Sequence, residues 1–135
     1  VVSSAAQRHP DAVRRIADAG HEVGSHSHSH RLLTGLSTAA RREEYARSRE
    51  MLRELTGQPV RGFRAPAFDV PPGHFEGLER AGYGYDSSVV ASRAVTGWYG
   101  GEYDIHEPVP ATAVRPRPAR ARRWAPLPVS PWACG

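Results

Sequence analysis

The sequence predicts an α/β fold with a parallel sheet, and the prediction rests on one unit that occurs twice. In each unit a helix ends in Ala-Gly, a short strand follows, and the strand leads to a polar residue. Gly20 precedes the strand that leads to His26, and Gly82 precedes the strand that leads to Asp86. Alternating helices and strands of this kind build parallel sheets, whose strands collect functional residues at their carboxyl ends.

The first unit opens with a helix predicted over residues 9–19. Pro10 suits a position in the first turn of a helix. Apolar residues then recur at the i, i+3, i+4 spacing of one helix face, namely Val13, Ile16 and Ala17. Residues 21–25 follow as a short predicted strand.

A longer helix is predicted over residues 37–55. Ser37 is its candidate N-cap and Gly57 its stop. One face of this helix carries Tyr45, Ser48, Leu52 and Leu55. The next predicted strand covers residues 59–63 and leads to Arg64.

A short helix over residues 74–81 and a strand over residues 83–85 complete the pattern. His26, Arg64 and Asp86 therefore follow three successive predicted strands. Because parallel strands end at the same edge of a sheet, we expect these three residues to lie close together.

The remainder of the chain is rich in proline and arginine. We predict one domain over residues 1–106, followed by a loop over residues 107–135 with one further candidate strand at 125–129. Prolines in that candidate restrict it to a sheet edge or a polyproline run. Cys134 is the single cysteine, so it forms no disulfide within the chain.

Charge and hydropathy exclude some classes of protein. The net charge is +4 and the pI about 9.8, but all 18 basic residues are arginine. We predict no nucleic-acid partner. A basic binding surface remains an alternative, formed by Arg115, Arg117, Arg120, Arg122 and Arg123. No apolar run approaches the roughly 18 residues of a membrane span, so none is predicted.

Three histidines lie within five residues of the segment Gly24–His30. In a helical turn, the four-residue spacing of His26 and His30 places both imidazoles on one side, where they can share a metal ion. In an extended segment, His26, His28 and His30 would share one face instead. The spacing does not decide between these arrangements.

The segment from Gly20 to His30 resembles the second motif of polysaccharide deacetylases, the NodB-homology group or carbohydrate esterase family 4. That motif is His-[Ser/Thr]-x-x-His after a Gly-His-Glu-aliphatic strand, and Ser27 fills its Ser/Thr position. The segment Arg64–Phe68 resembles the third motif, Arg-x-x-Pro-aromatic, with the proline one position early. Together with Tyr83–Ser88, this form is similar to the branch associated with exopolysaccharide loci and exosortases.

The resemblance implies a partial (β/α) barrel, truncated at both ends, that removes N-acetyl groups from a polysaccharide or oligosaccharide. It implies His26 and His30 as ligands of a divalent metal, with zinc the first choice, and Arg64 as a catalytic residue that orients a carboxylate base. Phe68 would wall the sugar groove. Asp86 is expected to contact substrate or Arg64, or to cap its strand, and His28 to be a solvated loop residue.

Two family motifs have no counterpart in this sequence. The Thr-Phe-Asp-Asp-Gly-like strand, which supplies the base and a third metal ligand, would lie before Val1. The late Leu-x-His motif, which supplies the general acid, is not found, and we predict His74 and His106 to be surface residues. We therefore expect a fragment that is inactive alone. The alternatives are a metal-independent, allantoinase-like amide hydrolase and a non-catalytic carbohydrate-binding remnant.

Overall fold

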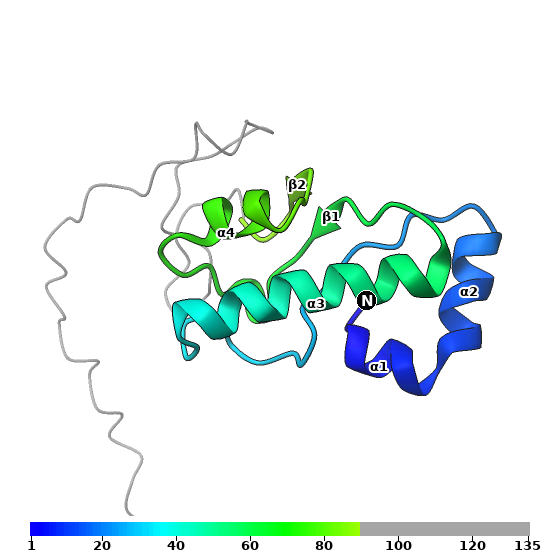
Figure 1. The fold of residues 1–135 in the computed structure, drawn as a ribbon, viewed down its shortest axis with the longest axis horizontal. Coiled ribbons are helices and arrows are strands. Elements are labelled where there is room, and N and C mark those ends of the chain that lie inside the picture. The colour runs from blue at the N-terminus through cyan, green and yellow to red at the C-terminus, as the bar shows by residue number, and fades with distance from the viewer. Residues whose placement is uncertain (90–135) are drawn as a thin grey trace, which may run out of the picture.

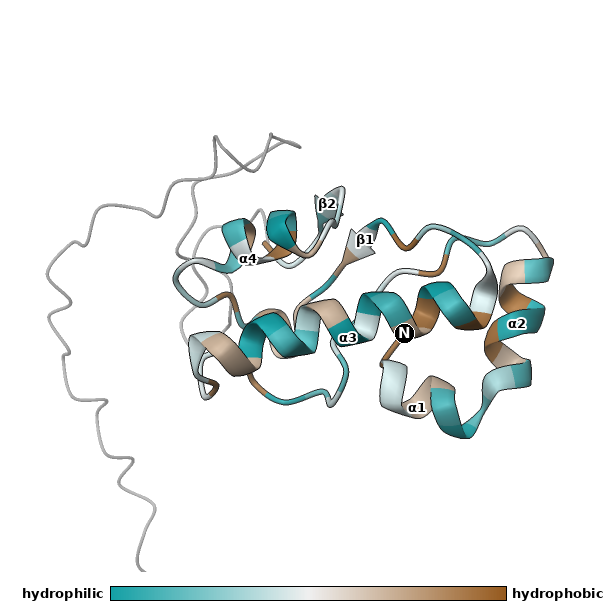
Figure 2. Ribbon diagram, viewed as in Figure 1, coloured by the Kyte–Doolittle hydropathy of each residue, from teal (hydrophilic) through white to brown (hydrophobic). Residues whose placement is uncertain are grey.

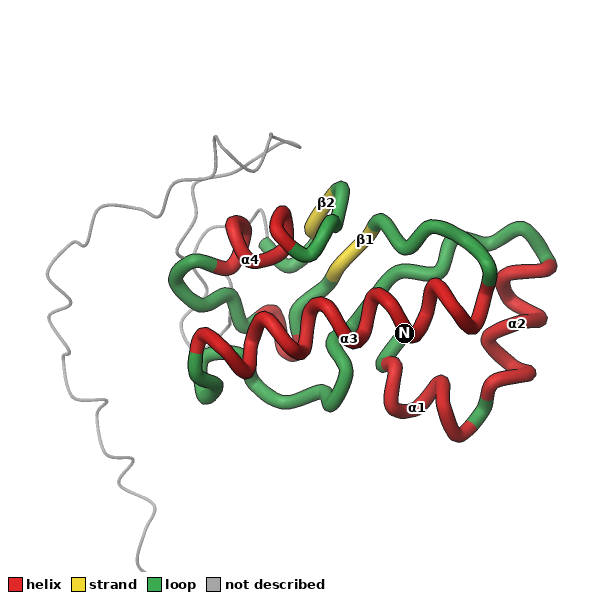
Figure 3. Tube along the Cα trace, in the orientation of Figure 1, coloured by secondary structure: helices red, strands yellow, loops and turns green. Residues whose placement is uncertain are grey.

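A computed structural model of the chain describes residues 1–89, and the structural statements below concern that part. Helices dominate it, and the strands are short (Figures 1 and 3). The elements in chain order are α1 (Ser3–Arg8), α2 (Pro10–Asp18), α3 (Thr38–Thr56), β1 (Gly62–Phe63), the 3-10 turn η1 (Pro66–Phe68), α4 (His74–Arg80) and β2 (Tyr85–Asp86).

The strands form a small parallel sheet. β1 pairs with β2 in a register that places Phe63 opposite Asp86, and Ser25 pairs with Phe63 through a parallel bridge on the other side. The strand predicted over residues 21–25 is therefore reduced to one bridging residue. Its ladder ends there because Ser27, the next residue that would face β1, has a left-handed backbone with φ of 64°, and its carbonyl oxygen accepts the N–H of Ser3. The N–H of His26 points to the opposite side and donates to the carbonyl oxygen of Val1 at 2.7 Å.

The three predicted helices are confirmed to within two residues at each end. In α3 the Oγ of Ser37 accepts the N–H of Ala40, as an N-cap does, and Gly57 ends the helix in the left-handed conformation. Helix α1 was not predicted. It has six residues and buries only Ser3 and Ala6, so no apolar period marks it in the sequence.

Helix α3 is the longest helix of the described part, and α1, α2 and α4 all pack against it. Helix α4 lies over its amino-terminal half, and α1 and α2 pack at its carboxyl-terminal end (Figure 1). Most of the α3 surface is hydrophilic (Figure 2), and its buried residues Tyr45, Ser48 and Leu52 lie on the predicted face. The α/β class predicted from the sequence is confirmed.

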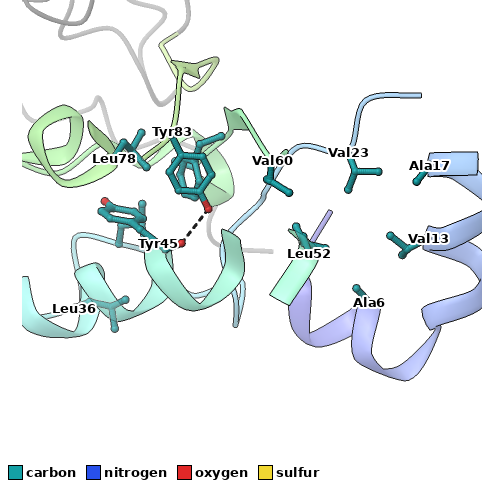
Figure 4. Close-up of a cluster of buried hydrophobic side chains, with 13 residues drawn as sticks. Ala6, Val13, Ala17, Val23, Leu36, Tyr45, Leu52, Val60, Leu78 and Tyr83 are labelled. Atoms are coloured by element: carbon teal, nitrogen blue, oxygen red, sulfur yellow. Dashed lines mark hydrogen bonds between the residues drawn. The ribbon is translucent and has the colours of Figure 1, made fainter. Parts of the chain in front are cut away.

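One continuous hydrophobic core joins these elements (Figure 4). Leu33, Leu52 and Val60 are fully buried within it. Burying one such side chain stabilises the fold by about 1.5–3 kcal/mol. Ile16, which the helical spacing assigned to the apolar face of α2, is 44% exposed instead.

Within residues 1–89, no helix combines the length and the apolar composition of a membrane span.

Several predictions concern residues that the structure does not describe. The segment 107–135, the arginines of the alternative basic surface, His106 and Cys134 all lie outside residues 1–89. The division of the chain at residue 106 also lies outside them. These predictions stay predictions.

Candidate metal-binding and catalytic site

The carboxyl ends of the three parallel segments lie at one edge of the sheet. His26 directly follows the bridging Ser25, and Arg64 directly follows β1. An open cleft of about 410 Å³ lies along this edge, lined by Val1, Gly24, Ser25, His26, Gly62, Phe63, Arg64, Tyr85 and Ser87. The expected proximity of His26 and Arg64 is confirmed.

His26 is held through one of its ring nitrogens. Its Nδ1 lies 2.6 Å from the carbonyl oxygen of Arg64. A carbonyl oxygen can only accept, so Nδ1 carries the proton, and in the neutral ring Nε2 then carries the free lone pair. Burial lowers the pKa of His26, as do the positive charges nearby, against the opposing effect of this hydrogen bond. The ring is therefore kept neutral, which is the state that binds a metal ion.

His30 faces His26 across a sharply bent loop. The two ring centroids are 4.9 Å apart and the rings are inclined at 66°. The loop is neither the helical turn nor the extended segment considered above. Ser27 and His30 adopt left-handed backbone conformations, with φ of 64° and 61°, and these bends bring residues 26 and 30 together.

His28 points elsewhere. Its Nδ1 lies 2.8 Å from the Oγ of Ser3 at the start of α1, and the residue is half-buried. The expectation of a solvated loop histidine is therefore wrong, because α1 covers one side of this loop. The extended geometry with three histidines on one face is also not found.

The histidine loop, defined as residues 26–30, is held by hydrogen bonds on both sides. From α1, the N–H groups of Ser3 and Ser4 donate to the carbonyl oxygens of Ser27 and His28, both at 3.1 Å. From α3, the carboxylate of Glu44 accepts bonds from the loop N–H groups. Glu44 could not be recognised from the sequence, because only the fold brings α3 beside this loop.

The Glu44 carboxylate is charged in this setting. Burial raises the pKa of Glu44, but the hydrogen bonds from Ser29 and His28 outweigh burial and leave the pKa below its usual value. Hydrogen bonds to the charged form favour that form.

Arg64 extends from the end of β1 towards two neighbours. Its Nε donates to the Oγ of Ser87 at 3.0 Å, and its guanidinium carbon lies 5.8 Å from the centre of the Phe68 ring. Phe68 is 38% exposed. Arg64 is exposed as well, so its guanidinium faces the solvent beside the cleft.

Asp86 is engaged within the protein. Its Oδ1 accepts the N–H of Ser88 at 2.8 Å, and its Oδ2 accepts the Ser88 hydroxyl at 2.7 Å. The Nε2 of His74 lies 3.3 Å from the same Oδ2. These contacts match the expected capping role, and the expected contact with substrate stays a prediction.

His74 is buried, so the prediction of a surface histidine is wrong. It is 1% exposed, and its Nδ1 lies 2.9 Å from the hydroxyl of Tyr45. Burial is tolerated because both ring nitrogens have partners. The Oγ of Ser88 also accepts the N–H of Ala65 at 2.7 Å, so a buried polar chain runs from Tyr45 to the residue after Arg64.

The paired imidazoles fit a metal ion in part. A centroid separation of 4.9 Å allows both rings to reach one ion at the usual Zn–N distance of about 2.0–2.1 Å. The hydrogen bond from Nδ1 of His26 to a carbonyl is the support that metal-binding histidines commonly have. Among residues 1–89, however, no group of three histidine, cysteine or acidic side chains surrounds one position.

The fold defines an α/β protein whose polar side chains gather at the carboxyl edge of a parallel sheet. The chain belongs to the polysaccharide deacetylase family, whose sequence profile matches residues 1–85. This agrees with the resemblance found in the histidine and arginine motifs.

Individual relatives agree with this family. A peptidoglycan deacetylase of Helicobacter pylori is 31% identical over 80 residues, which are 59% of this chain and 27% of that protein. A solved structure from Mycobacterium smegmatis, assigned to the polysaccharide deacetylases, is 35% identical to this chain with a TM-score of 0.64. The match covers 68% of this chain and 32% of the other. The allantoinase Puue is 32% identical with a TM-score of 0.59, over 65% of this chain and 29% of the other. The chain thus spans about a third or less of the length of these relatives.

Proposed function

We propose that the full-length protein is a metal-dependent hydrolase that removes N-acetyl groups from a polysaccharide. His26 and His30 would be two of the ligands of the metal. The observation that supports this most is the convergence of the two imidazoles, 4.9 Å apart, in a chain of this family. Zinc is our first choice, and other divalent ions that accept imidazole ligands also suit the pair.

The side chains of the site divide the work between binding and positioning. When bound, the metal would supply a water of lowered pKa and polarise the acetamide carbonyl. His26 would bind through Nε2 while the Arg64 carbonyl holds its ring in place. The Arg64 guanidinium, exposed beside the cleft, would orient and stabilise a carboxylate base, and Phe68 would form a wall of the sugar groove.

We propose that the third ligand and the base come from outside the 135-residue chain, since the motif that supplies them has no counterpart in this sequence. No acidic side chain of the described part joins the two imidazoles. The 135-residue chain alone would then release no acetate. The contacts of Asp86 favour a role in holding the strand end over a role in binding substrate.

We extend the proposal to the fold. The parallel segments at Ser25, β1 and β2 would be part of a NodB-type (β/α) barrel, with residues 1–106 in the barrel domain and residues 107–135 in a loop of it. Parallel pairing across all three segments supports this arrangement. Barrels of parallel strands place their active sites at the carboxyl ends, where His26 and Arg64 lie.

The substrate we propose is an N-acetylated polysaccharide or oligosaccharide. The name of the H. pylori relative makes peptidoglycan glycan strands one substrate to test. The similarity to an allantoinase supports a second candidate, a metal-independent hydrolase of a small ureide.

Acetate release from N-acetylglucosamine oligomers and from peptidoglycan tests the proposal. The full-length protein is stripped with a chelator and then reloaded with Zn²⁺. We expect activity only after reloading, and none for His26→Ala. Equal activity in the stripped protein, or hydrolysis of ureides alone, would favour the second candidate. Binding of the oligomers without hydrolysis in any metal state would favour a carbohydrate-binding remnant.

A further inference from the structure

We propose that Glu44 is a positioning residue for the histidine loop. Its carboxylate holds residues 26–30 in the conformation in which the imidazoles of His26 and His30 converge. The inference rests on the proposed metal-binding role of these two histidines. Glu44 itself would bind neither metal nor substrate.

Three hydrogen bonds join Glu44 to the loop. Its Oε2 accepts the N–H of His28 at 2.8 Å and the N–H of Ser29 at 2.9 Å. Its Oε1 accepts the hydroxyl of Ser29 at 2.6 Å. One carboxylate on α3 thus holds two successive backbone groups and a side chain that lie between the two candidate ligands. Bonds to an ionised acceptor are stronger than bonds between neutral groups.

The loop needs such support because its backbone is strained. Ser27 and His30 have φ of 64° and 61°, a region that residues with a Cβ avoid. Conformations of this kind persist only where surrounding contacts impose them. The bond from the N–H of His30 to the Oγ of Ser27, at 3.0 Å, stabilises the bend from within but does not tie it to the rest of the fold.

The two sides of the loop are held by different elements. Helix α1 binds the carbonyl oxygens of Ser27 and His28, whereas Glu44 binds the N–H groups of His28 and Ser29. Without Glu44 the carbonyl side remains attached, but the segment that leads to His30 loses its anchor to α3. His26 keeps a separate anchor in the Arg64 carbonyl. The geometry of the pair therefore depends on Glu44 mainly through His30.

Glu44→Ala in the full-length protein tests this role, with Glu43→Ala as the matched control. Alanine favours a helix and removes all three interactions, whereas glutamine could replace them with its amide oxygen and amide nitrogen. Glu43 is the adjacent residue of α3, is exposed, and its side chain makes no hydrogen bond with the other described residues. Thermal unfolding is recorded for each variant, so that a local change is separated from a loss of folding.

The first readout is hydrogen exchange of the His28 and Ser29 amides in the metal-free protein. We expect Glu44→Ala to accelerate exchange of both amides at least about tenfold, because it breaks the bonds that protect them. Glu43→Ala should leave both rates unchanged. Unchanged rates in Glu44→Ala would overturn the proposal, whether or not the protein binds a metal.

The second readout is the affinity and visible absorption spectrum of bound Co²⁺. Loss of supporting contacts around metal ligands typically weakens binding about 10–100-fold, and we expect a loss of that size with an altered spectrum for Glu44→Ala. Should this variant fail to fold, Ser29→Ala removes only one of the three bonds and should show a smaller loss. Unchanged affinity and spectrum in these variants would overturn the inference. Failure of the unsubstituted protein to bind Co²⁺ through His26 and His30 would instead contradict the proposed function.

Discussion

Removing the hydroxyl of Tyr45 should destabilise the protein, because it leaves a buried histidine without a partner. Tyr45 and His74 are each 1% exposed, and the hydroxyl lies 2.9 Å from Nδ1 of His74. Within residues 1–89 every buried side-chain nitrogen and oxygen has a hydrogen-bond partner. Tyr45→Phe keeps the ring and its packing against Phe63 but removes the partner of Nδ1.

The expected cost follows from that one unpaired nitrogen. A buried polar atom that loses its partner costs about 1–3 kcal/mol, and the ring itself stays in place. We therefore expect the free energy of unfolding to fall by about 1–3 kcal/mol. Since His74 also contacts Asp86, the change should reach Ser88 and the amide of Ala65 beside the site.

Urea denaturation of the full-length protein measures this cost, and Tyr85→Phe is its control. Tyr85 also uses its hydroxyl in a hydrogen bond, to Glu22 at 2.7 Å, but the residue is 49% exposed. Water replaces the lost partner there, so we expect a change within about 0.5 kcal/mol. Equal changes for the two variants would refute the argument that burial of the Tyr45–His74 pair sets the cost.

Three further predictions concern single side chains. Ser37→Ala removes the N-cap of α3 and should lower the free energy of unfolding by about 1 kcal/mol, measured by urea denaturation. Arg64→Lys removes the bond from Nε to Ser87 and should lower the rate of deacetylation by more than the extra unfolded fraction explains. A loss of rate that matches the unfolded fraction would contradict a role in the reaction. Because its folded-state pKa lies below the ordinary 4.5, Glu44 should stabilise the protein fully above pH 4.5 and progressively less as pH falls through the folded-state value. The difference in unfolding free energy between wild type and Glu44→Ala should therefore shrink in acid.

The helices could be predicted from the sequence because their signals are local. The cap at Ser37, the stop at Gly57 and the apolar face of α3 each act within a few residues, and the structure contains all three. The limits of the strands were harder to predict from the sequence. The strand that ends at Ser25 pairs through one residue only, because the backbone bends at Ser27 and the Ser27 carbonyl oxygen bonds to Ser3, a contact with a distant segment.

The site could be predicted in part. The pairing of His26 with His30 was implied by the resemblance to the second family motif, because the spacing alone left two arrangements open. The position of Arg64 near His26 follows from the rule that parallel strands end together. The roles of Glu44 and His74 could not be predicted, since each depends on contacts between elements far apart in the chain. An acidic residue on a helix and a histidine at a helix start are both ordinary surface patterns in a sequence.

Isothermal titration of the chelator-stripped full-length protein with Zn²⁺ tests the central claim most directly, using alanine variants of the three loop histidines. If the rings of His26 and His30 bind one ion, His26→Ala and His30→Ala should each weaken binding severely. His28→Ala should retain the wild-type affinity, because this ring contacts Ser3 rather than the paired imidazoles. Equal losses in all three variants, or unchanged binding when both His26 and His30 are replaced, would contradict the claim.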